Sequence, residues 1–169
     1  MTTVYNIIHA PFYDTYVKLV KTDDLRKTLR KNTEELLAFF EEIPEEKIGF
    51  AYADGKWTIK QVVQHIIDAE RIFAYRALRV ARLDATPLPG FDENLYAANA
   101  NVAVRGWEDM LKELRQLRKS NLRMIKAFTE EQLNAEGVAS GHPVSAAAIC
   151  FIMAGHAKHH INIIRERYL

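Results

Sequence analysis

The chain has 169 residues, of which 49% are hydrophobic and 27% are charged, and its formal net charge at pH 7 is +1. This length and composition are typical of one globular domain with a sizeable core, so we expect a single domain over residues 1–169. The small net charge, with basic residues scattered rather than interleaved with aromatic residues, argues against nucleic acid and against an anionic membrane surface as partners.

The N-terminal stretch and the single cysteine indicate the cellular compartment in which the protein is expected. The chain begins MTTVYNIIHAPFYD, which lacks the basic region and long apolar run of a signal peptide. No window approaches the roughly 18 apolar residues of a membrane-spanning helix. Cys150 has no partner for an internal disulfide, and its apolar neighbours indicate a small core residue rather than a reactive thiol. We therefore expect a cytoplasmic protein.

Apolar residues at helical spacing predict two helices in the first half of the chain. The first covers residues 24–42, with an apolar stripe that begins at Leu25 and a helix-ending proline, Pro44, just beyond it. The second covers residues 58–82. Thr58 is its N-cap, and the glutamine three residues later completes a capping box.

The second half of the chain predicts two more long helices. They cover residues 104–128 and 145–168, with a short turn at 130–133 between them and Ser145 as the N-cap of the last. In no segment do apolar and polar residues alternate as they would in a half-buried β-strand, so we expect an all-α fold. Four amphipathic helices of this length pack most simply as a four-helix bundle. The connection over residues 84–106 is too long for a tight turn, and we expect it to cross the bundle end or to cover a site.

Several polar side chains face the core when each helix is placed on a wheel. Glu70 lies in the centre of the second helix's apolar stripe, and His65 lies at its margin. Arg118 and Asn121 face inward on the third helix, and Arg167 faces inward on the fourth. Because an unpaired buried polar group costs about 1–3 kcal/mol, these groups must compensate one another. We predict that Glu70 pairs with Arg118, with Arg167 as the alternative partner.

Two histidines of the fourth helix, His156 and His160, fall near the middle of its apolar stripe. They are four residues apart, so both imidazoles project from one face. Such residues either bond to carbonyl groups in the core or chelate a metal ion together with a third helical histidine, and spacing alone favours neither. Ala157 stands where the zinc-protease motif H-E-x-x-H has its glutamate, so that helix-borne base is missing. Three neutral imidazoles suit zinc, nickel, copper or iron, and leave coordination positions open.

Two segments carry a resemblance to a known family. These are GKWTIKQVVQHIIDAERIFAYRALRVA, followed by PLPGFDEN, and the C-terminal GHAKHHINIIRERYL. They resemble the DinB-like superfamily, and within it the YfiT-type branch of metal-dependent hydrolases. The resemblance implies a four-helix bundle with a crossed, up-down-down-up connection. It also implies a metal site on His65, His156 and His160, and a homodimer, since related proteins are often dimers.

The resemblance implies a metal enzyme acting on a small molecule without fixing the reaction. The superfamily contains S-transferases that use bacillithiol, mycothiol or glutathione. We favour thiol transfer, in which one divalent transition ion, nickel or zinc above others, binds a low-molecular-weight thiol as thiolate. The alternatives are hydrolysis by metal-bound water and a non-enzymatic metal-binding module of a stress response.

Other polar residues are candidates for contact with a metal ligand or a substrate. Asp68 could orient a ligand or accept a proton, although its outward wheel position favours a solvated surface acid. Arg76 could bind the carboxylate of a thiol cofactor, but an ion pair with a neighbouring helix is favoured. Asp92 and Asn94 could cover the site or serve a plain turn. His159, at the edge of the stripe, is not a ligand in the resembling family, and is a candidate for contact only.

Overall fold

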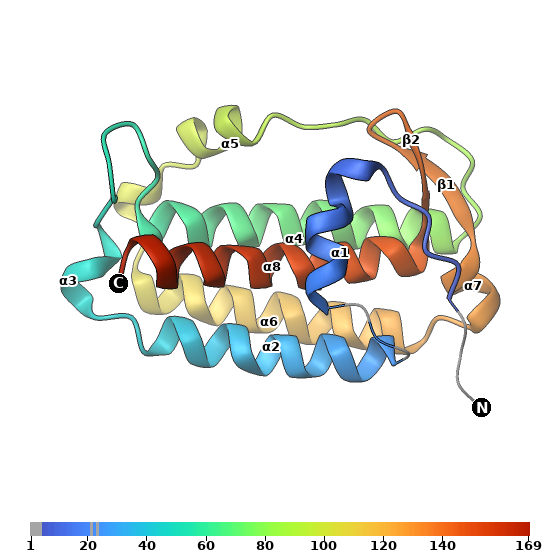
Figure 1. Cartoon of the computed structure of the whole chain (residues 1–169), viewed down its shortest axis with the longest axis horizontal. Coiled ribbons are helices and arrows are strands. Elements are labelled where there is room, and N and C mark those ends of the chain that lie inside the picture. Colours follow the sequence, from blue (N-terminus) through green and yellow to red (C-terminus); the bar gives the residue numbers. More distant parts are fainter. Residues whose placement is uncertain (1–4, 21, 23) are drawn as a thin grey trace.

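Within residues 5–20, 22 and 24–169, which are the residues that the computed structural model describes, four long helices form a bundle. They are α2 (Leu25–Glu41), α4 (Ile59–Ala81), α6 (Trp107–Lys126) and α8 (Ala146–Arg167). Helices α6 and α8 each pack against both α2 and α4, so α2 and α4, which are consecutive in the bundle, stand diagonally opposite. Figure 1 shows α2 and α8 running in one direction and α4 and α6 in the other. The predicted four-helix bundle with an up-down-down-up order is thereby confirmed.

The helix boundaries follow from the capping residues. Thr58 and Gln61 form the predicted capping box at the start of α4, and the Ser145 hydroxyl accepts a hydrogen bond from the amide of Ala148 at the start of α8. Helix α6 begins at Trp107, later than predicted, because residues Val102–Val104 form a separate 3-10 turn, η2. The turn after α6 is a short helix, α7 (Glu130–Asn134).

Short helices join the long ones. A 3-10 turn, η1 (Pro11–Tyr13), leads into α1 (Asp14–Val20), which lies across α8 (Figure 1). The crossing depends on Gly155, because a Cβ atom there would lie 2.0 Å from the carbonyl oxygen of Tyr16. The sequence prediction did not include α1. Helix α3 (Glu45–Ile48) follows α2, and α5 (Glu93–Asn99) lies in the long connection between α4 and α6.

A β-hairpin stands between α7 and α8, so the prediction of no strand was wrong. Strands β1 (Glu136–Ala139) and β2 (His142–Ser145) pair antiparallel, and the two residues between them, Ser140 and Gly141, both have positive φ, at 52° and 78°. Strands this short carry no visible alternation. The long connection pairs with the hairpin at Leu88, whose amide donates to the carbonyl of Val138 at 2.9 Å.

The interior consists of two apolar clusters with polar side chains between them. Asn32 of α2 donates to the carbonyl of Ala154 in α8 at 3.1 Å, and Arg118 of α6 donates to Asn32 at 2.9 Å. Arg118 also pairs with Glu70 of α4, so this polar layer joins all four long helices. Among the described residues, no helix is both long and apolar enough to cross a membrane.

Candidate metal centre

The centre lies beside the polar layer, where α4 and α8 face each other. His65 of α4 and His156 of α8 are buried, and their Nε2 atoms lie 2.8 Å apart. His160, one turn further along α8, places its Nε2 atom 3.1 Å from that of His156. The ligand atoms of all three side chains lie within 4.8 Å of one another. The structure therefore brings together the three histidines that the resemblance implied.

This donor set fits a transition-metal ion. Ligand nitrogens about 2.0–2.1 Å from one ion, at octahedral or tetrahedral angles, lie roughly 2.9–3.4 Å apart, close to the separations seen here. Burial lowers the pKa of His65 from 6.5 to about 4, and burial together with the neighbouring imidazoles lowers that of His160 to about 3. Burial, then its histidine neighbours, holds the pKa of His156 well below its ordinary value. All three imidazoles are therefore neutral at pH 7 and have lone pairs for a metal.

Aromatic side chains from three parts of the chain enclose the histidines. The ring of Trp57 lies 4.9 Å from that of His65, and the rings of Phe73 and Tyr16 lie 5.6 and 5.5 Å from that of His156. Tyr16 comes from α1, so the close crossing at Gly155 sets its position. These contacts restrict rotation of the imidazoles and keep bulk water from much of the centre.

Comparison with known sequences identifies the family. Residues 28–164 match the sequence profile of the DinB superfamily. The chain belongs to the DinB superfamily. A protein of Oceanobacillus iheyensis named "putative metal-dependent hydrolase" is 28% identical over 143 residues, which cover 82% of this chain and 80% of that protein. A protein of Geobacillus kaustophilus with the same description is 27% identical over 120 residues, covering 69% and 66%.

A solved structure shares the fold. YfiT from Bacillus subtilis, described as "a probable metal-dependent hydrolase with an unusual four-helix bundle topology", superposes with a TM-score of 0.73 and 18% identity. The match covers 96% of this chain and 89% of YfiT. At 18% identity, this likeness shows that the two proteins share a fold and nothing more.

The polar layer beneath the centre matches one sequence prediction and corrects another. Glu70 and Arg118 are paired at 3.0 Å, and Asn121 donates to Glu70 at 3.0 Å. Arg167, expected inside, is exposed and donates to the hydroxyl of Tyr52 at 3.3 Å. It lies in the last turn of α8, where a long side chain can leave the apolar stripe and reach solvent.

Arg76 does not form the ion pair with a neighbouring helix that the sequence favoured. It is buried, and its guanidinium donates to the carbonyl of Pro89 at 2.6 Å and to the hydroxyl of Ser140 at 3.1 Å. In the described part of the chain it forms no ion pair. The wheel could not show this, because the long connection and the hairpin cover a face of α4 that a bundle alone would leave open. Arg76 thus fastens the connection to the bundle.

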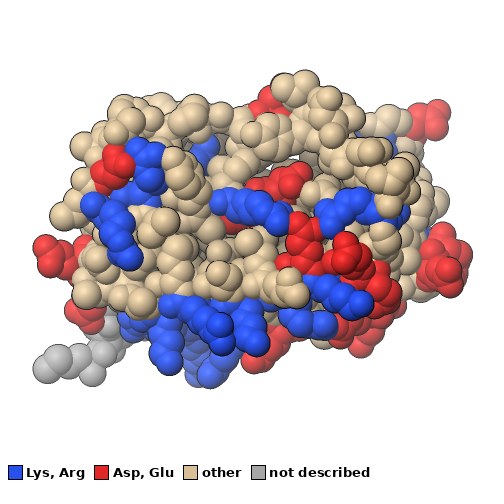
Figure 2. All heavy atoms as spheres, turned by 180° about the vertical axis from the view of Figure 1, so that it is seen from behind, with Lys and Arg blue, Asp and Glu red and all other residues tan. Residues whose placement is uncertain are grey.

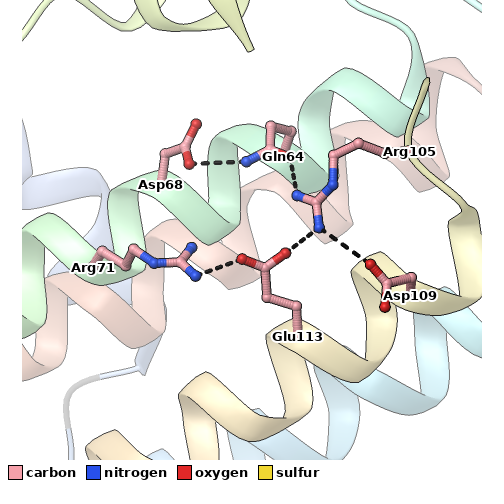
Figure 3. Close-up of polar contacts among 6 residues, drawn as sticks. All are labelled: Gln64, Asp68, Arg71, Arg105, Asp109 and Glu113. Carbon is pink, nitrogen blue, oxygen red and sulfur yellow. Dashed lines mark hydrogen bonds and ion pairs between the residues drawn. The ribbon is translucent and has the colours of Figure 1, made fainter. Parts of the chain in front are cut away.

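Asp68 belongs to a polar network on the outer face of α4 and α6. Its carboxylate accepts a hydrogen bond from Gln64 at 2.9 Å, and Arg105 links Gln64 to Glu113 (Figure 3). Figure 2 shows basic and acidic side chains interleaved at the centre of this face. Burial raises the pKa of Asp68, with Gln64 opposing the shift. Asp68 is half-buried rather than fully solvated, and among the described residues it forms no hydrogen bond or ion pair with the three imidazoles.

The remaining candidates, Asp92 and His159, do not belong to the cluster of three ligand histidines. Asp92 caps α5, where its carboxylate accepts from the amide of Asn94 at 2.9 Å, so it serves the turn. His159 is half-buried with its ring 5.1 Å from that of Tyr16, outside the ligand cluster. Burial lowers its pKa.

Sequence reasoning missed the aromatic enclosure and one acid. Burial raises the pKa of Tyr16, and the negative charge of Glu93 raises it further, so Glu93 of α5 lies near Tyr16. The aromatic residues of the PFYDTY segment were the available signal for Tyr16. Nothing in the sequence indicates that the charge of Glu93 would act on Tyr16.

Proposed function

We propose that this chain is an enzyme that holds one divalent transition-metal ion, nickel or zinc above others, on His65, His156 and His160, and transfers the sulfur of a low-molecular-weight thiol to an electrophile. The observation that carries the proposal is the convergence of three neutral Nε2 atoms in an enclosed site. The names of the two relatives support metal dependence.

A bound ion would supply Lewis acidity, which lowers the pKa of a thiol or of water. In S-transfer, the thiol sulfur forms a bond to the electrophilic carbon, the leaving group departs with the electron pair of the broken bond, and the thiol proton passes to solvent. The protein orients the three imidazoles through Trp57, Phe73 and Tyr16 and limits the access of water.

The surroundings of the histidines favour a thiol over water as nucleophile. Among the described residues, no acidic side chain forms a hydrogen bond or an ion pair with His65, His156 or His160. Attack by water requires a proton acceptor within hydrogen-bond reach. A thiol, with a pKa of about 8.5, needs only a small downward shift to be ionised at neutral pH.

Hydrolysis is the second candidate, and the electrostatic effect of Glu93 on Tyr16 is the observation that favours it. The charge of this carboxylate raises the pKa of Tyr16, whose ring lies 5.5 Å from that of His156, so Glu93 is an acid of the long connection whose charge acts on a residue that encloses the centre. The relatives' description as metal-dependent hydrolases agrees with this alternative. In hydrolysis, Glu93→Gln should abolish turnover, whereas in S-transfer it should leave most of the activity.

The deciding experiment compares both reactions in metal-loaded protein. A reactive electrophile is incubated with glutathione, bacillithiol or mycothiol, and ester and amide substrates are assayed in parallel without thiol. We expect thiol-dependent conjugation that is lost in His160→Ala and kept in His142→Ala, a control histidine that is exposed on the hairpin. Metal-dependent turnover of esters or amides with no effect of thiol would overturn S-transfer in favour of hydrolysis.

A further inference from the structure

A groove of about 520 Å³ runs along the edge of the bundle where the start of α2 meets the end of α6. Four basic side chains line it, namely Arg26, Lys27, Arg30 and Lys126. The guanidinium of Arg26 is held at the groove by a hydrogen bond of 2.9 Å to the carbonyl of Phe128. Because α6 and α8 each pack against both α2 and α4, the α2–α6 edge lies opposite the α4–α8 edge that carries the three histidines. The groove is therefore separate from the candidate metal centre.

The positive charge of the groove is not neutralised by the protein. Lys27, Arg30 and Lys126 are exposed, and within the part of the chain that the structure describes they form no ion pair. Asp24 also lines the groove, but its carboxylate is the N-cap of α2 and accepts a hydrogen bond from the amide of Lys27 at 2.9 Å. The groove thus attracts an anionic partner.

The basic surface continues beyond the groove. Lys31 lies one turn after Lys27 on α2, and Lys119 and Arg123 lie on the face of α6 that carries Lys126. Figure 2 shows Lys and Arg side chains gathered along the lower edge of the molecule, left of centre. These residues are far apart in the sequence, and they come together because α2 and α6 run in opposite directions, so that the start of one lies beside the end of the other (Figure 1).

The floor of the groove is apolar, and this feature selects among anionic partners. Leu29, Leu122 and Ile125 form the floor, and Leu122 is only partly buried. The described lining holds no aromatic ring on which a nucleic acid base could stack. None of the strongly exposed apolar side chains of the described residues lies on these parts of α2 and α6, so none is placed there to enter a lipid bilayer. A hollow with basic walls and an apolar floor fits an acidic protein segment that also carries an apolar side chain.

We propose that this groove docks an acidic segment of another protein, with an aliphatic side chain on Leu122 and carboxylates beside Lys27, Arg30 and Lys126. The residues from Lys119 to Lys126 extend about 10 Å along α6, so roughly three to four extended residues of the partner would cover the basic surface. The inference goes beyond the proposed function, because a partner bound at this edge leaves the opposite edge, with its histidines, free for a substrate.

The test measures fluorescence anisotropy of a labelled peptide made of aspartate and glutamate with one leucine at its centre. We expect saturable binding that weakens as the salt concentration rises from about 50 to about 300 mM. Lys27→Glu combined with Lys126→Glu, which reverses one charge on each wall, should weaken binding by about tenfold or more. Lys56→Glu is the matched control, because Lys56 is exposed but does not line the groove, and it should change the affinity by less than about twofold. A peptide with serine in place of leucine should bind more weakly.

Four results would overturn the proposal in variants whose circular dichroism and melting temperature match those of the wild type. The first is absence of peptide binding, and the second is equal binding by the double variant and Lys56→Glu. The third is binding of oligothymidylate or of phosphatidylserine vesicles at least as tight as that of the peptide, which would make the surface a site for nucleic acid or lipid. The fourth is a dimer in gel filtration that the double variant converts to a monomer, which would make a second copy of the chain the occupant.

Discussion

Replacement of Glu70 by glutamine tests whether the polar layer is compensated as the structure indicates. Glu70 and Arg118 are 2% and 1% exposed, and Glu70 Oε2 lies 3.0 Å from Arg118 Nε. Burial raises the pKa of Glu70, while Arg118 and Asn121 lower it. Glu70→Gln removes the counter-charge of a buried guanidinium, which costs about 3–5 kcal/mol of unfolding free energy. For a domain of this size, that loss lowers the melting temperature by roughly 6–20 °C.

The assay is thermal and urea unfolding followed by circular dichroism. Glu41→Gln is the matched control, because Glu41 pairs with Arg115 at the surface, where both side chains are about half exposed, and such pairs contribute about 0–1 kcal/mol. Glu70→Gln combined with Arg118→Met removes both charges and should recover much of the loss. If Glu70→Gln unfolds at the same midpoint as Glu41→Gln, the ion pair does not stabilise the core and this reasoning is refuted.

Three further predictions concern the centre. Gly155→Ala should displace α1 from α8 and lower the melting temperature clearly, because the added Cβ would meet the Tyr16 carbonyl; an unchanged melting temperature and unchanged protection of α1 amides from hydrogen exchange would contradict this. Metal-free protein should lose stability as the pH falls below about 6.5. The pKa values of His65 and His160 are lowered in the folded protein, so the unfolded chain binds protons at these residues that the folded protein does not. A urea midpoint that stays constant between about pH 7 and pH 5 would contradict this prediction. Zinc or nickel at about 100 times its dissociation constant should stabilise the wild type by about 2.7 kcal/mol and leave His160→Ala unchanged; equal stabilisation of both would contradict it.

The helical spacing of apolar residues was sufficient to predict the features that depend on a single helix and its buried face. It predicted the four long helices and placed His156, His160, Glu70 and Arg118 inward, because burial repeats at the helical period over many turns. His65 was marginal on its wheel, since α4 also faces the long connection, and its assignment to the centre came from the family resemblance.

The features that periodicity missed depend on contacts between distant segments. Strands of four residues show no alternation, and α1 is positioned by a close approach at Gly155 rather than by a stripe of its own. Arg167 occupies a stripe position in the last turn of α8, where the side chain can reach solvent. Arg76 is covered by the connection and the hairpin, and a helical wheel contains no information about either.

The central claim is that His65, His156 and His160 hold one metal ion, and elemental analysis of protein purified without added metal tests it most directly. We predict about one first-row transition ion per chain in the wild type, strong loss in His156→Ala and His160→Ala, and retention in His159→Ala, whose imidazole lies outside the ligand cluster. Full metal occupancy in folded His160→Ala protein would contradict the account.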